Sequence, residues 1–243
     1  MDERGVDVFS ISDHDTLAAY GAFTPRGTAR VVVGIEINTT YRENEVHVLG
    51  YGITPDHPQM CAMIERNIAE RRKRIDTMIS RLQRAGYSIT FEDVAREAGV
   101  AKALGRPHVG KALVRAGMAP DLEWVFRNLL RGGKPGYVPS KHVTPQEAIE
   151  TISRAGGVAV LAHPGRLKDR AIINELAECG LHGLEVFYPR HDGSDIAAFR
   201  AFANRHGLVM TAGSDFHDIR YHAHGVGMVV DDADIAPFLD LVL

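Results

Sequence analysis

Gly157-Val158-Ala159-Val160-Leu161-Ala162-His163-Pro164 is the stretch that decides the fold of this chain. Its run of small and apolar residues predicts a strand buried on both faces, which is typical of parallel sheets. The run leads directly into His163, so an imidazole follows the carboxyl end of a buried strand. In barrels of parallel strands, active sites lie at that end. Other strands that end in polar residues would therefore define both a fold and a site.

From Thr144 onward, helical and strand-like patterns alternate on both sides of this run. Thr144 is expected to cap the helix before the run, with Pro145 in its first position and Glu147 completing a capping box. This alternation predicts an α/β protein with a parallel sheet and helices outside it. The predicted elements are the helices Thr144–Arg154, Lys168–Cys179, Ser194–His206 and Ile235–Val242, and the strands Gly183–Tyr188, Leu208–Ala212 and Val226–Val230.

The amino-terminal part adds three strand-like runs, at Val6–Ile11, Arg30–Ile37 and Glu45–Tyr51. A long amphipathic pattern over Gln59–Ala85 follows, and three shorter helical patterns come after it, at Phe91–Ala98, Pro107–Ala116 and Leu122–Leu130. We therefore predict an α/β domain made of residues 1–54 and 140–243, interrupted by a helical insertion domain at residues 55–139.

Bulk composition narrows the class of protein. The chain has 243 residues, 45% of them hydrophobic, and a formal net charge of −3, so no basic field recruits a long nucleic acid duplex. The two cysteines are isolated, which favours a reducing, cytoplasmic setting. No apolar run has the length needed to span a bilayer, and the first residues have no signal-peptide character. The sequence does not indicate an oligomeric state.

Polar residues of metal-ligand type fall where the predicted strands end. Each has an ordinary alternative: Asp15 with Thr16 can cap the following helix, and His47, inside a strand pattern, can be a satisfied strand histidine. Their recurrence at several strand ends favours a shared site. Imidazoles and carboxylates together suit zinc, manganese or iron(II). The residues are His14 and Asp15 after the first strand, Glu36 near the end of the second, His163, and Asp215 and His217 after Leu208–Ala212.

Five segments in this order resemble the motifs of the PHP (polymerase and histidinol phosphatase) domain phosphoesterases. The resemblance covers nearly the whole chain. It is strongest to the bacterial subfamily that removes the 3′-phosphate from nucleoside 3′,5′-bisphosphates, whose members also act as 5′→3′ exoribonucleases on short RNA. The segments are Ile11-Ser12-Asp13-His14-Asp15-Thr16, Gly34-Ile35-Glu36-Ile37, Val46-His47-Val48-Leu49-Gly50-Tyr51, Ala162-His163-Pro164-Gly165-Arg166 and Gly213-Ser214-Asp215-Phe216-His217.

This resemblance implies a distorted (β/α)7 TIM-like barrel that binds two or three divalent metal ions, with manganese expected and zinc or iron(II) as alternatives. The implied substrate is a small phosphorylated nucleotide or a short oligonucleotide, with no membrane partner. Glu36 is the implied bridge between ions. The implied ligands are His14, Glu36, His47, His163, Asp215 and His217.

The chain departs from the family at its start. Family members begin with a strand that ends in His-x-His, followed by an Asp, and this sequence has none of them. One explanation is that Met1 is an internal methionine or an alternative start; the other is a true truncation that leaves a degenerate, non-catalytic barrel. We favour the first, because losing an interior strand would expose two parallel strand edges.

Phosphate recognition needs cations near the site. Arg166 is expected to contact the phosphoryl group, and Arg106 and His108, at the start of a predicted helix, resemble a substrate-contacting segment of the family. An ordinary capped helix start explains Arg106 and His108 equally well. Asp15 is a further expected substrate contact. Metal ions would activate water, Arg166 would stabilise the phosphoryl charge, and His217 or His14 would protonate the departing oxygen. A different PHP activity, such as histidinol phosphate hydrolysis, is the alternative.

Overall fold

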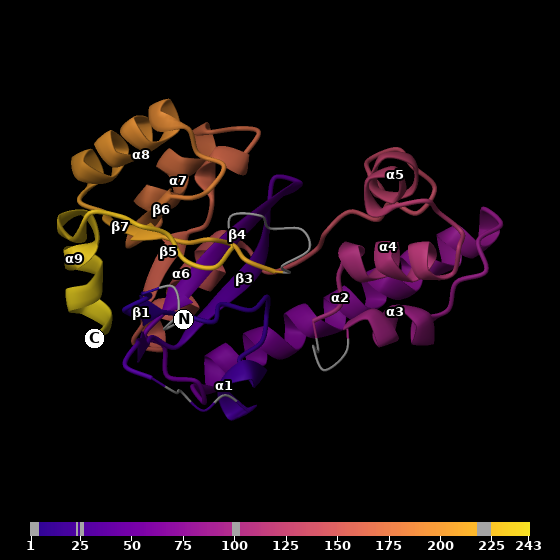
Figure 1. Ribbon diagram of the computed structural model, residues 1–243, viewed down its shortest axis with the longest axis horizontal. Coiled ribbons are helices and arrows are strands. Elements are labelled where there is room, and N and C mark those ends of the chain that lie inside the picture. The colour runs from indigo at the N-terminus through magenta and orange to yellow at the C-terminus, as the bar shows by residue number, and fades with distance from the viewer. Residues whose placement is uncertain (1–4, 23, 25–26, 99–102, 218–224) are drawn as a thin grey trace. The chain divides into compact units, whose positions relative to one another are not determined.

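The computed structural model describes residues 5–22, 24, 27–98, 103–217 and 225–243 and has a mixed α/β fold (Figure 1). Its central sheet has five strands that lie side by side in sequence order. They are β3 (Gly34–Tyr41), β4 (Asn44–Tyr51), β5 (Val158–Leu161), β6 (Gly183–Phe187) and β7 (Val209–Ala212). Two short strands, β1 (Val8–Phe9) and β2 (Arg30–Val31), pair in parallel as a second sheet. His14 connects the two parts through an isolated parallel bridge to Glu36.

The sheet is parallel only in part. β5, β6 and β7 run parallel, as the alternation of helices and strands predicts. The expectation of a parallel sheet is wrong for β3 and β4, which form an antiparallel hairpin, and for β4 and β5. Only Arg42 and Glu43 connect β3 to β4, with φ of 46° and 67°. A two-residue turn with positive φ at both positions reverses the chain and cannot serve a parallel pair.

The predicted amino-terminal strands are interrupted by one side chain. The carbonyl oxygens of Ile11 and Val32 lie 2.9 and 3.0 Å from the hydroxyl oxygen of Tyr20 and share its one proton, and this oxygen accepts from the backbone N–H of Ile11 and Gly34. These backbone groups are the ones that a continuous ladder would use. The predicted strand Arg30–Ile37 is therefore split into β2 and β3, and β1 is shorter than predicted. The prediction of a strand at Val226–Val230 is also wrong, because those residues form no ladder.

Helices cover the sheet and begin at capped positions. α6 packs against β3, β4 and β5, α8 packs against β6 and β7, and α9 packs against β7. The predicted cap is confirmed at Thr144, whose Oγ1 accepts from the backbone N–H of Glu147 at 3.2 Å. Apolar side chains such as Ile149 and Val160 are fully buried in this unit. The helices are α1 (Ala18–Ala22), α6 (Pro145–Arg154), α7 (Ala171–Glu178), α8 (Gly193–His206) and α9 (Asp232–Val242).

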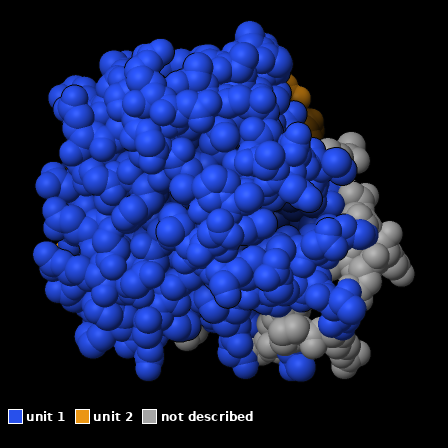
Figure 2. Space-filling model, turned by 90° about the vertical axis from the view of Figure 1, so that its left-hand side faces the viewer, with its two compact units in different colours: residues 1–63, 143–243 blue, residues 64–142 orange. Residues whose placement is uncertain are grey.

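The described chain divides into two compact units, residues 1–63 with 143–243 and residues 64–142 (Figure 2). In this division the first residues of α2 (Pro58–Arg84) belong to the first unit and the rest of the helix belongs to the second. The second unit also contains α3 (Phe91–Ala98), α4 (Arg106–Arg115), α5 (Leu122–Val125) and the π-helical turn η2 (Phe126–Leu130). Within the described ranges, no helix combines the length and the apolar character needed to cross a membrane.

Candidate metal centre

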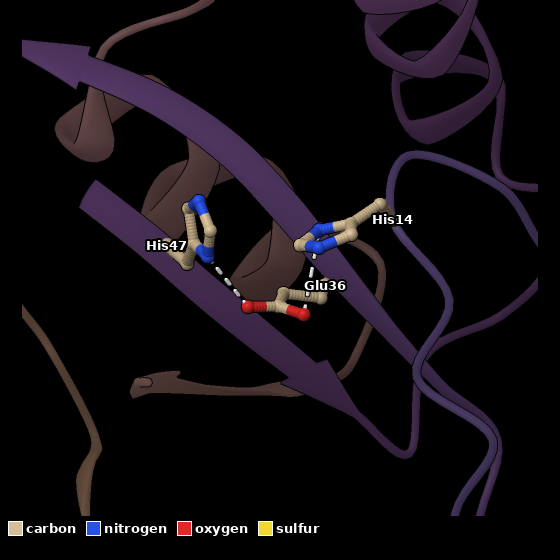
Figure 3. Close-up of side chains that lie close together, drawn as sticks. All are labelled: His14, Glu36 and His47. Carbon is tan, nitrogen blue, oxygen red and sulfur yellow. Dashed lines mark hydrogen bonds and ion pairs between the residues drawn. The ribbon is translucent and has the colours of Figure 1, made fainter. Parts of the chain in front are cut away.

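One buried carboxylate, Glu36, is surrounded by three histidines from different parts of the first unit. Its Oε2 lies 3.3 Å from His14 Nδ1, and its Oε1 lies 2.7 Å from His47 Nδ1 and 3.1 Å from His163 Nε2. Figure 3 shows His47 facing one oxygen of the carboxylate and His14 facing the other. Glu36 is near the beginning of β3, not near its end as predicted, because the strand starts only at Gly34. The structure therefore brings together four of the six predicted ligands, namely Glu36 and the three histidines around it.

Electrostatics tie these residues together. Burial on its own would raise the pKa of Glu36, but the charges of His14 and His47 and the hydrogen bonds from His163 and His47 hold it well below its usual value. Burial would lower the pKa of His47, yet the neighbouring carboxylate of Glu36 raises it to about 9. The centre thus keeps an ionised carboxylate in the interior, where an unpaired charge would be costly.

The donor set fits a divalent metal ion. One ligand atom from each of His14, Glu36 and His47 lies within 4.8 Å of the others. The Nδ1 of His47 faces His163 Nε2 at 3.2 Å. Among the described residues, the buried Nε2 of His47 has no partner at hydrogen-bond distance, and Glu45 Oε1 lies 3.8 Å from it. Imidazole nitrogens that converge on a carboxylate oxygen are the donors that zinc, manganese and iron(II) accept.

Asp215 and Arg166 lie together beside this group. Asp215, in the loop after β7, accepts from Arg166 Nη1 at 3.3 Å and from the Tyr188 hydroxyl at 3.0 Å. His217 lies further out, with its ring centroid 5.9 Å from that of His14 and half of its side chain exposed. The half-exposed guanidinium of Arg166 sits on η3 (Pro164–Arg166), directly after His163. The structure thus brings a cation and a second carboxylate to the same strand ends.

Asp15 has a different role from the substrate contact that the sequence predicts. It is completely buried, its Oδ1 accepts from the backbone N–H of Asn38, and its Oδ2 accepts from the Asn38 side chain at 2.9 Å. Asn38 Nδ2 also lies 2.9 Å from His14 Nδ1. Of the two residues offered as a cap for the next helix, Thr16 makes the bond, because its Oγ1 accepts from the backbone N–H of Ala18. Asp15 therefore orients Asn38, and through it the imidazole of His14.

Sequence reasoning missed two residues next to His163. Glu185, on β6, accepts from the backbone N–H of His163 at 2.7 Å, and His191 accepts from that of Gly165 at 3.1 Å. Burial, together with the charges of Glu36 and Asp215, raises the pKa of Glu185 to about 8. The available signal was the carboxylate of Glu185 inside the otherwise apolar run Gly183–Tyr188.

Arg106 and His108 belong to the second unit, so their grouping with the metal centre stays a prediction. Within that unit, His108 Nδ1 accepts from the backbone N–H of Gly105 at 3.0 Å and so caps the first turn of α4. Burial, with the charges of Lys111 and Arg71, lowers the pKa of His108 to about 4. Its ring is therefore neutral at physiological pH and acts there as a hydrogen-bond acceptor.

The fold and the centre define an α/β protein with a site for divalent metal ions, built from histidines and a buried carboxylate. No family model matches the chain. A curated relative, the 3′,5′-nucleoside bisphosphate phosphatase of Chromobacterium violaceum, is 34% identical over 88% of this chain and 78% of its own length. The 5′-3′ exoribonuclease Rnm of Escherichia coli is 33% identical over 88% and 76%. A phosphoribosyl 1,2-cyclic phosphate 1,2-diphosphodiesterase of Eggerthella lenta is 31% identical over 88% and 84%.

Solved structures agree with these relatives. An amidohydrolase from Chromobacterium violaceum, with bound sulfate and no metal, superposes with a TM-score of 0.88 at 30% identity, covering 99% of this chain and 87% of its own. A structure from Bifidobacterium adolescentis, assigned as a metal-dependent phosphoesterase, gives a TM-score of 0.82 at 26% identity and coverages of 100% and 88%. The chain belongs to the PHP-type phosphoesterase family and is a metal-dependent phosphoric ester hydrolase.

Proposed function

We propose that this chain is a manganese-dependent phosphoesterase that acts on nucleoside 3′,5′-bisphosphates or releases 5′ nucleotides from short RNA. The observation that carries the proposal is the carboxylate of Glu36, which lies within 3.3 Å of ring nitrogens of His14, His47 and His163. The relatives from Chromobacterium violaceum and Escherichia coli, whose names give these two activities, support the substrate class.

The proposed ligands divide between the two oxygens of Glu36. Its Oε2 faces His14 and its Oε1 faces His47 and His163, which supports a bridge between two ions. Asp215 and His217, from the loop after β7, complete the proposed set. When bound, such ions activate water and stabilise the departing oxygen of a phosphate ester.

The remaining chemistry falls to side chains at the rim. Arg166 is half exposed and 3.3 Å from Asp215, so its guanidinium can hold a phosphoryl oxygen next to the metal ligands. His217 is also half exposed, and we assign it the transfer of a proton to the departing ribose oxygen, with His14 as the alternative donor. Arg106, at the start of α4, is proposed to bind a second phosphate, because backbone N–H groups and the helix dipole favour anions there.

The proposal extends to the detailed architecture of the sheet unit. We place the five-stranded sheet and the β1–β2 pair in one distorted (β/α)7 barrel, supported by the bridge between His14 and Glu36 that links them. Residues 55–139 are then an insertion that carries substrate contacts. A cytoplasmic setting is supported by Cys61 and Cys179, which are both free thiols.

Hydrolysis of three candidate substrates, with and without added manganese, tests the proposal. Adenosine 3′,5′-bisphosphate, a short 5′-phosphorylated RNA and phosphoribosyl 1,2-cyclic phosphate represent the activities named for the three relatives. We expect manganese-dependent turnover of the bisphosphate or the RNA, abolished in His163→Ala. Preference for the cyclic phosphate would change the proposed substrate class but leave the proposed metal centre standing. Full activity in His163→Ala would contradict the assigned site.

A further inference from the structure

The turn that carries both His163 and Arg166 has an unusual backbone. His163 adopts φ 31° and ψ 59°, in the left-handed region. For a residue with a side chain, this conformation costs on the order of 1–2 kcal/mol. It persists only when surrounding contacts hold it. The contacts that hold this turn therefore also set the direction of the two side chains.

The backbone donors of the turn all have identifiable partners. Pro164 has no N–H, and the N–H of Arg166 donates to the His163 carbonyl at 2.9 Å inside the turn. The two that remain leave the turn: the N–H of His163 donates to Glu185 Oε2 at 2.7 Å and the N–H of Gly165 donates to His191 Nε2 at 3.1 Å. Glu185 and His191 are therefore the described side chains that hold the backbone N–H groups of this turn from outside.

Both acceptors are themselves held rigidly. His191 is buried and its Nδ1 donates to the carbonyl of Val186 at 2.9 Å, so its Nε2 is free to accept. A Cβ at Gly165 would lie only 2.7 Å from the His191 ring, so the backbone sits directly against it. Glu185 is also buried, and a Cβ at Gly213 would overlap its Oε1, so this carboxyl group also lies against the loop that leads to Asp215.

We propose that Glu185 and His191 are positioning residues that clamp the His163–Arg166 turn, and that they thereby set the metal affinity of His163 and the phosphate contact of Arg166. The inference rests on the proposed function, which assigns metal binding to His163 and the phosphate contact to Arg166. Glu185 holds the backbone of His163 by a hydrogen bond. Its carboxyl group also contacts Gly213 and so positions the loop that leads to Asp215. His191 controls the Arg166 end, because Gly165 directly precedes that residue.

Three variants and a matched control test the clamp in the full chain. Glu185→Ala removes one acceptor, Glu185→Gln keeps an acceptor oxygen of the same size, and His191→Phe keeps the ring volume beside Tyr188 and Phe199. The control is His182→Phe, because His182 Nδ1 accepts the backbone N–H of Ala159 at 3.0 Å, a similar bond at the other end of β5.

Manganese titration and steady-state kinetics give the functional results. We expect Glu185→Ala to weaken manganese binding about 10- to 100-fold and Glu185→Gln to restore most of it, as for other partners of metal ligands. His191→Phe should raise KM for the phosphate ester about 10-fold with a smaller change in kcat. His182→Phe should lower the melting temperature without either effect. Wild-type manganese affinity in Glu185→Ala, or equal losses in His182→Phe, would overturn the inference.

Amide hydrogen exchange separates the clamp from the proposed function. Exchange at His163 should accelerate in Glu185→Ala, and exchange at Gly165 should accelerate in His191→Phe, whether or not metal binds. If the wild-type chain neither binds manganese nor hydrolyses substrate, the proposed function fails and these two amides alone decide the clamp. Unchanged exchange in both variants would refute it.

Discussion

The two units of the molecule bury different kinds of side chain. The helical unit is built around a cluster of apolar side chains, with Met78, Leu82 and Leu113 among its fully buried members. Among the described residues, all but two of the buried polar and charged side chains belong to the sheet unit, the exceptions being Asn67 and Arg71.

This difference separates stability from function. A buried polar group costs free energy unless it is hydrogen-bonded, and a buried charge costs more unless it is paired. The sheet unit carries that cost where Glu36 meets its histidines and where Glu185 meets the backbone of His163. Substitutions in this group should therefore change the chemistry more than the fold, and substitutions in the helical core should do the reverse.

The largest effect is expected for Glu36→Gln. Loss of the charge that faces three histidines should lower kcat/KM about 1000-fold, or about 4 kcal/mol of transition-state stabilisation. Manganese binding should weaken in parallel, which calorimetric titration can measure. Glu175→Gln is the matched control, since Glu175 pairs with Arg42 at 2.9 Å away from the centre. Equal activity in the two variants would contradict the role assigned to Glu36 in the centre.

In the helical unit, Leu82→Ala should act on stability alone. Leu82 is fully buried, so its truncation should lower the free energy of unfolding by about 3 kcal/mol. Denaturant unfolding measures this loss. The kcat of the folded fraction should not change. Leu241→Ala, at a side chain that is 60% exposed, should have little effect on either quantity. A loss of kcat in Leu82→Ala at full folding would mean that the two cores are not separable.

Arg166→Ala should raise KM for the phosphate ester about 30-fold, which corresponds to about 2 kcal/mol for a charged hydrogen bond. Arg166→Lys should recover part of it, because the charge remains but the planar fork does not. Arg170→Ala serves as the control: Arg170 pairs with Asp195 at 2.7 Å and has no assigned contact with substrate. Steady-state kinetics at several substrate concentrations distinguish the three variants.

The two units should respond to pH in opposite directions. The folded pKa of His108 is lowered from 6.5 to about 4, so the unfolded chain binds more protons in that range and stability falls as pH drops from 6.5 towards 4. The folded pKa of Glu185 is raised from 4.5 to about 8, so its contribution is present below 4.5 and is lost as pH rises towards 8. The free energy of unfolding, measured with denaturant between pH 4 and pH 8, should fall towards both ends of this range. His108→Asn should reduce the loss of stability towards pH 4, and Glu185→Gln should reduce the loss towards pH 8. Unaltered pH profiles would contradict these assignments.

The smallest effect is expected at a helix cap. Thr144→Ala removes the bond to the backbone N–H of Glu147 and should lower the free energy of unfolding by about 1 kcal/mol. Kinetic constants should stay at their wild-type values, although α6 packs against the sheet that carries the centre. Thr77→Ala, which removes a hydroxyl bonded only within α2, should cost less.

Much of the centre follows from local sequence. His163 comes directly after an apolar run, and the cap at Thr144 has a local signature, so both are visible without a structure. The roles of Asn38 and Glu185 could not be predicted from the sequence, because a single polar residue inside a strand pattern does not reveal which residues it contacts across the sheet. The role of Asp15 was mispredicted for the same reason: its partner, Asn38, lies on β3, far from Asp15 in the sequence.

The sequence by itself determined the alternation of elements, the helical character of the middle segment and the residue types at the strand ends, because these depend on hydrophobic period and on local capping. Only the tertiary structure decided the antiparallel pairing of β4, the split of one predicted strand by Tyr20, and the distances that join His14, Glu36, His47 and His163. These depend on contacts between residues far apart in the chain, which no local pattern specifies.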